Sequence, residues 1–295
     1  MMEMREFLPY FWKIPAGMGG FTLGLLIGGM VLPILGLNIP VIPEGVDTAT
    51  VGIIAMTMSV LVIISSALIA KDLEGTFWSR WVSIGMLIFV AYGVNNALEG
   101  ALFSTIEALA TPENMISTIV LQAFPSFMSG AVIAGTVKPK ERGQPFQENI
   151  QIFLASWGVN MLLLRLVISW VAFVIIYAGI GMLIAPFVMP IYTAGEFNLI
   201  LPSFDQILIL QFIRGAFILV ICLLLIIAWQ GSNLRFFVSL GVALSILLGL
   251  FPLTLSYWIA IEVRAIHIIE IAVDSFLYAG VLTKLFLRPP TLSEK

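Results

Sequence analysis

The sequence predicts an all-α membrane protein that crosses the bilayer eight times, with both termini in the cytoplasm. Three observations predict it: the composition, eight long apolar windows, and the distribution of Lys and Arg among the connecting segments. Of the 295 residues, 60% are hydrophobic and 11% are charged, whereas about 25% are charged in an average soluble domain. This composition excludes an ordinary soluble enzyme, a disordered chain and a collagen-like chain.

The counts of charged residues, Cys and His exclude further classes of protein. There are 14 Lys and Arg residues against 17 Asp and Glu residues, with no basic stripe or tail, so no nucleic acid partner is expected. One Cys excludes an intrachain disulfide, and one His excludes a His-rich metal centre. We therefore expect no cofactor and no metal, and we expect the lipid bilayer itself as a partner.

The apolar windows predict the transmembrane helices. A bilayer core about 30 Å thick needs about 20 mostly apolar residues per spanning helix. The apolar runs are continuous rather than alternating, which favours helices over a β-barrel. The fifth window is too long for one perpendicular span, so we expect it to begin as an interfacial stretch near Gln151–Trp157 or to tilt. The eight windows are Gly17–Gly36, Val51–Ala70, Trp81–Phe103, Met115–Val137, Phe153–Phe187, Phe204–Trp229, Phe236–Trp258 and Ala265–Leu287.

The basic residues assign the orientation, because cytoplasmic loops carry an excess of Lys and Arg. The loops after the first, third and fifth windows carry acidic residues and no Lys or Arg. Of the 14 basic residues, 11 lie in the segments on the opposite side, only Arg264 lies on the acidic side, and Arg165 and Arg214 lie within spans. A missed or false span would invert every later loop. We therefore expect eight spans with cytoplasmic termini, in the plasma or inner membrane.

Two pairs of similar segments indicate an internal 4+4 repeat. Arg80–Gly85 resembles Arg235–Gly241 with one insertion, and Pro125–Ser129 lines up with Asp274–Tyr278. Because four is an even number of spans, the two halves would be parallel and related by an axis along the membrane normal. Chance recurrence of short apolar words is the alternative. The expected organisation is a single integral-membrane domain over residues 1–295, with halves 1–137 and 150–288 joined by a cytoplasmic loop 138–149.

Polar residues inside the spans are informative because each is costly in lipid and so usually faces protein or water. The last window and the residue directly before it contain four polar residues: Arg264, His267, Glu270 and Asp274. Their spacing of 3, 3 and 4 places them on one helix face about 120° wide. Glu270 and Asp274 would lie about 9 and 15 Å from the outer end of this helix. Two carboxylates one turn apart repel each other, so one keeps a proton or both need a basic partner.

Polar residues on two other spans lie at a similar depth. Arg214 in the sixth span is expected about 15 Å from the outer surface, and the polar end of the third span about 6–12 Å from it. These spans could converge on the last one. The expected substrate- or proton-binding site, between spans 3, 6 and 8, consists of Asn95, Asn96, Glu99, Arg214, His267, Glu270 and Asp274.

Three interpretations of these residues remain open. The first is a structural network that holds the helices together, with Arg214 paired to Asp274 or Glu270. The second is a water-filled cavity, open to the outside, that binds a small polar or anionic solute or carries protons. The third is catalysis, with His267 and Glu270 as metal ligands or as a base and the residue that orients it.

The leading hypothesis is the second interpretation, binding or translocation of a small solute or protons. Asp274 and Glu270 would then be the titrating groups, Arg214 the counter-charge and His267 a proton partner. One alternative is an intramembrane enzyme that acts on a lipid or lipid-linked substrate. Another is a non-catalytic subunit of a larger complex, which would require a membrane-protein partner, and a homo-oligomer is compatible with each hypothesis.

Overall fold

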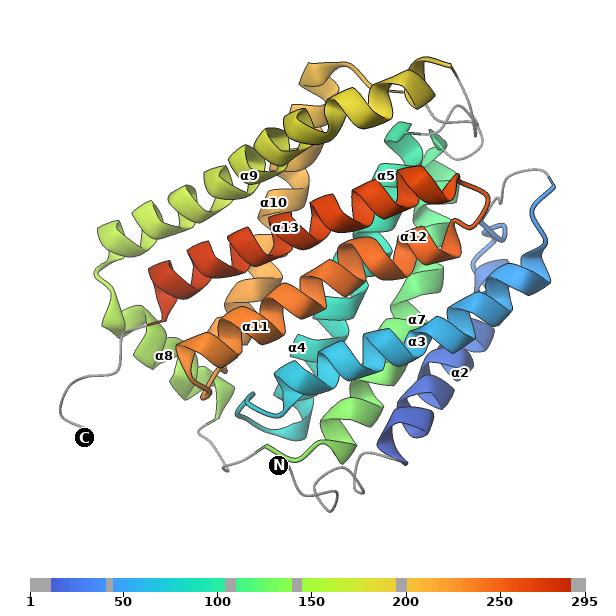
Figure 1. Ribbon diagram of the computed structural model, residues 1–295. Coiled ribbons are helices and arrows are strands. Elements are labelled where there is room, and N and C mark those ends of the chain that lie inside the picture. Colours follow the sequence, from blue (N-terminus) through green and yellow to red (C-terminus); the bar gives the residue numbers. More distant parts are fainter. Residues whose placement is uncertain (1–11, 41–44, 104–109, 140–144, 195–200, 288–295) are drawn as a thin grey trace, which may run out of the picture.

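The computed structural model describes residues 12–40, 45–103, 110–139, 145–194 and 201–287. Over these ranges the chain is helical and has no strand, apart from one isolated β-bridge between Leu73 and Trp229. Figure 1 shows the helices packed as one bundle. In chain order they are α2 (Lys13–Ile34), α3 (Thr48–Ala70), α4 (Phe77–Ile88), the π-helix η2 (Phe89–Val94), α5 (Asn95–Phe103), α7 (Pro112–Thr136), α8 (Phe146–Ser156), α9 (Val159–Thr193), α10 (Phe204–Ile227), α11 (Asn233–Leu244), the π-helix η4 (Ser245–Leu250), α12 (Phe251–Leu255) and α13 (Ile261–Phe286).

Eight helices in the described part of the chain are long and apolar enough to cross a membrane, which confirms the predicted number of spans. Two of them are continuous α–π–α helices: α4, η2 and α5 form the third span, and α11, η4 and α12 form the seventh. The protein is therefore an all-helical, multi-pass integral membrane protein.

The fifth window separates into two helices. Helix α8 lies within the stretch expected to be partly loop and partly interfacial, and Trp157 and Gly158 separate it from α9. Helix α9 has 35 residues, so it is about 52 Å long, well beyond the ~30 Å bilayer core. It continues to Thr193, past the expected end at Phe187. Tilt, or extension beyond the bilayer core, accounts for this excess length.

Consecutive spans run in opposite directions (Figure 1), so the bundle has two chemically different ends. The acidic end, as we use the term, is the one where the chain places Asp47, Glu113 and Glu262. The basic end is the opposite one, with Lys71, Arg235 and Lys284. Several of the basic residues on which the expected orientation rests lie outside the described residues; among them are Arg5, Lys140, Arg142, Arg288 and Lys295.

Capping residues fix several helix starts. Asp47, Thr76, Thr111 and Ser232 each accept a hydrogen bond from a backbone N–H in the first turn of the helix that follows. At the start of α10, Gln206 Oε1 accepts hydrogen bonds from the Ser203 backbone N–H at 3.0 Å and from the Ser203 hydroxyl at 2.9 Å. These side chains satisfy N–H groups that have no intrahelical acceptor, and they place each helix start at a defined residue.

The third and seventh spans form the centre of the bundle. In each, 61% of the most apolar stretch is buried, against 17% in α9. The two spans meet across the centre, where the rings of Tyr92 and Phe251 lie 4.8 Å apart, edge to face. Helix α9 is therefore a peripheral helix, packed mainly on α13 and α10.

The β-bridge at the basic end joins two chain segments that are 156 residues apart in sequence. The Glu74 N–H donates to the Ala228 carbonyl at 2.8 Å, and the Gln230 N–H donates to the Asp72 carbonyl at 2.9 Å. The Gln230 side chain also donates to Glu74, its counterpart at the separation of 156 residues. Adding 156 to the residue numbers of one segment gives those of the other, so each backbone bond is the counterpart of the other, as across a two-fold axis.

The same separation relates the starts of three helices. Helices α10, α11 and η4 begin 156 residues after α3, α4 and η2, respectively. Their contacts correspond as well. A Cβ placed on Gly85 would lie 2.5 Å from Phe127, and one placed on Gly241 would lie 2.6 Å from Phe276. A second set of close approaches repeats this register: Gly93 with Gln122, and Gly249 with Ile271.

This register differs from the expected alignment at one point. The expected alignment also pairs Phe127 with Phe276, but it places one insertion between the third and seventh spans, whereas the helix starts and glycine contacts keep one separation of 156 residues. The separation of 156 residues pairs Arg80 with Phe236, whereas the expected alignment pairs it with Arg235. The two arginines also differ in environment: Arg80 is buried, whereas the side chain of Arg235 is 43% exposed.

Candidate functional site

Arg214 on α10 is the centre of a buried polar cluster in the half of the bundle nearer the acidic end. Its Nε donates to Oδ1 of Asn95 at 2.6 Å, and its Nη1 donates to Oε1 of Gln211 at 3.1 Å. The same Nη1 lies 2.7 Å from Oε1 of Glu99. Its Cζ lies 4.9 Å from the centre of the Tyr177 ring, within the range of a cation–π contact. The guanidinium is thus held by α5, α9 and its own helix.

A second cluster lies on α13 and α9. His267 Nδ1 and Glu270 Oε2 are 2.6 Å apart, and His267 Nε2 is 3.2 Å from the hydroxyl of Tyr192. The spacing of three residues brings His267 and Glu270 together on one face of α13. The Glu270 side chain also faces α9 at Gly181, where a Cβ would lie 3.4 Å from Oε1. Both nitrogens of the imidazole therefore have partners.

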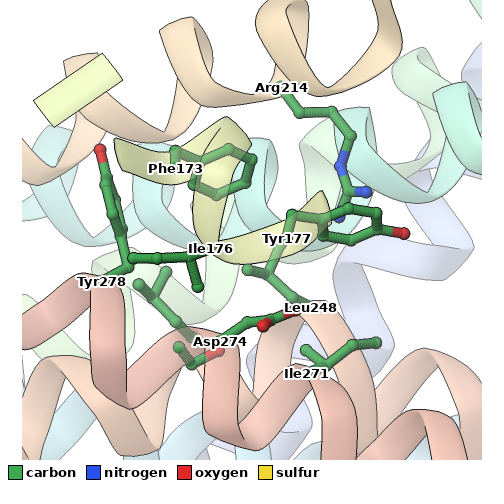
Figure 2. A pocket seen from close by; sticks show the side chains of 10 residues that line it. Phe173, Ile176, Tyr177, Arg214, Leu248, Ile271, Asp274 and Tyr278 are labelled. Carbon is green, nitrogen blue, oxygen red and sulfur yellow. The ribbon is translucent and has the colours of Figure 1, made fainter. Parts of the chain in front are cut away.

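Asp274 lies one turn further along α13 and has no such partners. Only 9% of the residue is exposed, and neither carboxylate oxygen has a hydrogen-bond partner among the described residues. Asp274 lines a cavity of about 20 Å³ together with Arg214 and Tyr177 (Figure 2). In this view, Arg214 reaches from α10 toward the Tyr177 ring, and Asp274 lies on the opposite side of the cavity, on α13. A cavity of this volume holds about one water molecule.

The remaining walls of the cavity are mostly apolar. They come from α9, α13 and the seventh span, including Phe173, Leu248 and Ile271. Two further polar atoms on α13, Ser275 Oγ and the Tyr278 hydroxyl, are buried without a hydrogen-bond partner within the described ranges. Polar atoms of Asp274, Ser275 and Tyr278 therefore line one small cavity without a hydrogen-bond partner among the described residues. This arrangement is expected around a bound water or a transient ion.

The partly exposed members of the two clusters lie nearer the acidic end than the cavity does. The side chains of Glu99 and His267 are 24% and 21% exposed, whereas Arg214 and Glu270 are buried. Glu270 and Asp274 are separated by about 6 Å along the helix axis. Polar groups therefore extend from the partly exposed His267 to the cavity beside Asp274.

Six of the seven residues expected at the site belong to these two clusters or to the cavity. Asn96 is the exception: it is half-buried and has no hydrogen bond to the other six. Adjacent helical residues project about 100° apart, so Asn95 and Asn96 face different neighbours. The ion pair also differs from the expected one, because Arg214 contacts Glu99 rather than Asp274 or Glu270.

Helix α9 contributes two tyrosines that are not among the residues expected from the sequence. Tyr177 faces Arg214, and Tyr192 faces His267. Both carry a hydroxyl within a long apolar helix, and this signal could have marked them as candidates for the site. For metal binding, the described residues contain no group of three or more His, Cys, Asp or Glu side chains placed to hold an ion.

The comparisons with known proteins add no assignment to this geometry. The chain matches no protein-family model, no curated protein and no solved structure.

Proposed function

We propose that the protein translocates protons, or a small polar or anionic solute together with protons, through the site on α5, α9, α10 and α13. The observation that carries this proposal is the buried Asp274 carboxyl, which lies unpartnered beside a water-sized cavity. Ionisable groups within transmembrane helices are costly and commonly belong to ion or proton pathways. Asp274 takes up and releases the proton, and Glu270 and His267 connect it to the acidic end.

Arg214 is the counter-charge in this mechanism. Its ion pair with Glu99 and its hydrogen bond to Asn95 hold the guanidinium at one wall of the cavity. A negative charge on Asp274 is stabilised by this guanidinium, whereas the neutral acid is stabilised by the apolar walls. An anionic solute that enters from the acidic end would meet the same guanidinium, which supports a role in solute binding.

The orientation and the internal repeat are part of this proposal. The basic end lies in the cytoplasm, as the distribution of Lys and Arg supports, so the site faces the outside of a plasma or inner membrane. The recurring separation of 156 residues and the matching glycine contacts support two parallel four-span halves. Within such halves, the cavity belongs mainly to the C-terminal one.

One observation favours a second function. Glu270 holds the His267 ring on one nitrogen while the Tyr192 hydroxyl contacts the other. A carboxylate that orients a histidine is the arrangement of a general base. An intramembrane enzyme acting on a lipid or lipid-linked substrate is the corresponding candidate, with His267 as the base.

Proton flux into vesicles tests the first proposal. The purified protein is reconstituted with a pH-sensitive dye inside, and a potassium diffusion potential drives proton entry. We expect flux from the wild type, none above empty vesicles from Asp274→Asn, and partial flux from Asp274→Glu. The matched control is Glu262→Gln, an exposed carboxylate on the same helix, which keeps wild-type flux.

Two outcomes contradict the proposal. One is wild-type flux through Asp274→Asn. The other is failure of Asp274→Asn to accumulate as folded protein while Glu262→Gln accumulates normally, which indicates a structural network. The enzyme candidate is tested by incubating the protein with membrane lipids: a product formed by the wild type and lost in His267→Gln, with proton flux absent in both, favours catalysis.

A further inference from the structure

A groove at the basic end lies apart from the Asp274 cavity. It has a volume of about 460 Å³ and runs between α8, the ends of α10 and α13, and the segments joined by the β-bridge. Its lining includes Glu74, Asn149, Phe153, Trp157, Trp229 and Phe286. This volume falls within the range of small-molecule sites.

The polar side of the groove combines a carboxylate with amide and indole groups. Glu74 Oε2 accepts a hydrogen bond from Gln230 at 2.6 Å and a longer one from Asn149 at 3.4 Å. Trp229 is 7% exposed, and its Nε1 has no hydrogen-bond partner within the described ranges. A buried indole N–H is normally satisfied, so this donor indicates a missing acceptor.

The other side of the groove is apolar. The rings of Phe153 and Phe286 lie 6.1 Å apart at the junction of α8 and α13. Next to them, α8 exposes Ile152 and Leu154, as a helix that lies in the bilayer interface would. The Arg165 guanidinium stacks on Trp157 at 3.8 Å from the ring centre, which adds positive charge at this edge.

We propose that this groove binds a zwitterionic phospholipid whose headgroup carries an amine. The ammonium lies against the Glu74 carboxylate, with which it forms a charge-assisted hydrogen bond. The phosphate accepts a hydrogen bond from Trp229 Nε1, and the acyl chains follow Ile152 and Phe153 along the apolar side. Glu74 disfavours an anionic headgroup, and the apolar half favours a lipid over a free amine.

Lipid retention tests this proposal. The full-length protein is purified from nanodiscs that contain equal amounts of phosphatidylethanolamine and phosphatidylglycerol, and the retained lipids are counted by native mass spectrometry. We expect the wild type to retain phosphatidylethanolamine preferentially. Glu74→Gln should lower this preference about tenfold, the effect of one charge-assisted hydrogen bond. Trp229→Phe, which keeps a ring and removes the N–H, should lower it by a smaller factor.

The matched control is Glu148→Gln, a carboxylate on α8 that is exposed and does not line the groove. It should retain lipid as the wild type does, and thermal melting shows whether each variant is folded. The proposal is overturned if the wild type retains both lipids equally or prefers phosphatidylglycerol. It is also overturned if folded Glu74→Gln keeps the wild-type preference, or if free ethanolamine displaces the lipid at equal concentration.

Discussion

Contacts between the third and fourth spans recur between the seventh and eighth spans, whereas the two groups of four spans differ in chemistry. In both groups, the third span contains a π-helix that begins 12 residues after the first residue of that span. In both, a glycine of this span, Gly85 or Gly241, contacts a phenylalanine on the fourth span. The ring pairs correspond too: Trp81 with Phe127 at 6.2 Å, and Phe237 with Phe276 at 5.7 Å, both edge to face. The contacts between the last two spans of each group therefore match.

The polar residues are not shared. At the register of the matching contacts, Met58 stands where the C-terminal half has Arg214, and Pro125 stands where it has Asp274. Thr118 and Leu121 correspond to the remaining pair of the α13 cluster, His267 and Glu270.

This difference bears on the purpose of the charges. The matching contacts in the N-terminal group form without ionisable groups at these positions, so those contacts do not require them. Buried charges also contribute little net stability compared with apolar residues of similar volume. The residues at these positions in the N-terminal group support the proposal that Arg214 and Asp274 have a functional role.

Replacing Arg214 by methionine, the residue type that Met58 provides at the corresponding N-terminal position, should have the largest effect on stability. Arg214→Met leaves the Glu99 carboxylate without its cation and Asn95 without its donor. Removing one partner of a buried pair costs about 3–5 kcal/mol, so the midpoint of thermal unfolding in detergent should fall sharply. The double variant Arg214→Met/Glu99→Gln should recover a large part of this loss. No recovery in the double variant would show that the ion pair is not the source of the loss.

The two corresponding glycines test whether the halves are equivalent. Gly85→Ala and Gly241→Ala each place a methyl group less than 3 Å from a phenylalanine ring, and each should destabilise the protein by about 1–3 kcal/mol through overpacking. Gly29→Ala is the control, because nothing lies within 4 Å of its added Cβ. The halves are not equivalent if the melting temperatures of Gly85→Ala and Gly241→Ala differ by more than the melting temperature of Gly29→Ala differs from that of the wild type.

The two arginines at the basic end should behave differently. Arg80 donates to the carbonyls of Ala70, Ala134 and Val137, so Arg80→Met leaves buried acceptors unpaired and should cost about 1–3 kcal/mol. Arg235 pairs with Asp72 at 2.9 Å, and although the Asp72 side chain is only 6% exposed, that of Arg235 is 43% exposed. Water can replace the guanidinium beside the carboxylate, so Arg235→Met should cost less than Arg80→Met. Equal losses in unfolding free energy would contradict this assignment.

The smallest expected effect concerns the cap of α3. Hydrogen bonds from the Thr50 hydroxyl and from the backbone N–H groups of Ala49 and Thr50 hold the pKa of Asp47 below its ordinary value. A carboxyl with a lowered pKa in the folded state stabilises that state at neutral pH and loses this contribution as the pH falls through the folded pKa. Asp47→Ala should therefore lower the melting temperature slightly at pH 7. The difference from the wild type should disappear in acid; a difference that grows with acidity would contradict the cap.

The spans could be read from the sequence because continuous apolar runs of sufficient length have few alternatives in a bilayer. The face of α13 that carries His267, Glu270 and Asp274 could also be read, because it depends only on the 100° rotation between helical residues. Both follow from local sequence.

The pairing of Arg214 with Glu99 and the roles of Tyr177 and Tyr192 could not be read in this way. They depend on how separate helices are rotated and tilted against one another, which no single helix encodes. The π-helix η2 adds a further shift, because its wider turns change which residues after it face the bundle. This shift immediately precedes Asn95, where the expected pair of asparagines separates into one that contacts Arg214 and one that does not.

Access of water to Asp274 tests the central claim most directly. Asp274→Cys in a Cys222→Ala background is exposed to silver ion on one side of oriented vesicles, then denatured and labelled with a maleimide. We predict that silver applied at the acidic end protects Cys at position 274 from labelling, and that silver applied at the basic end does not. Protection from the basic end alone, or from neither end, would contradict a proton pathway that opens at the acidic end.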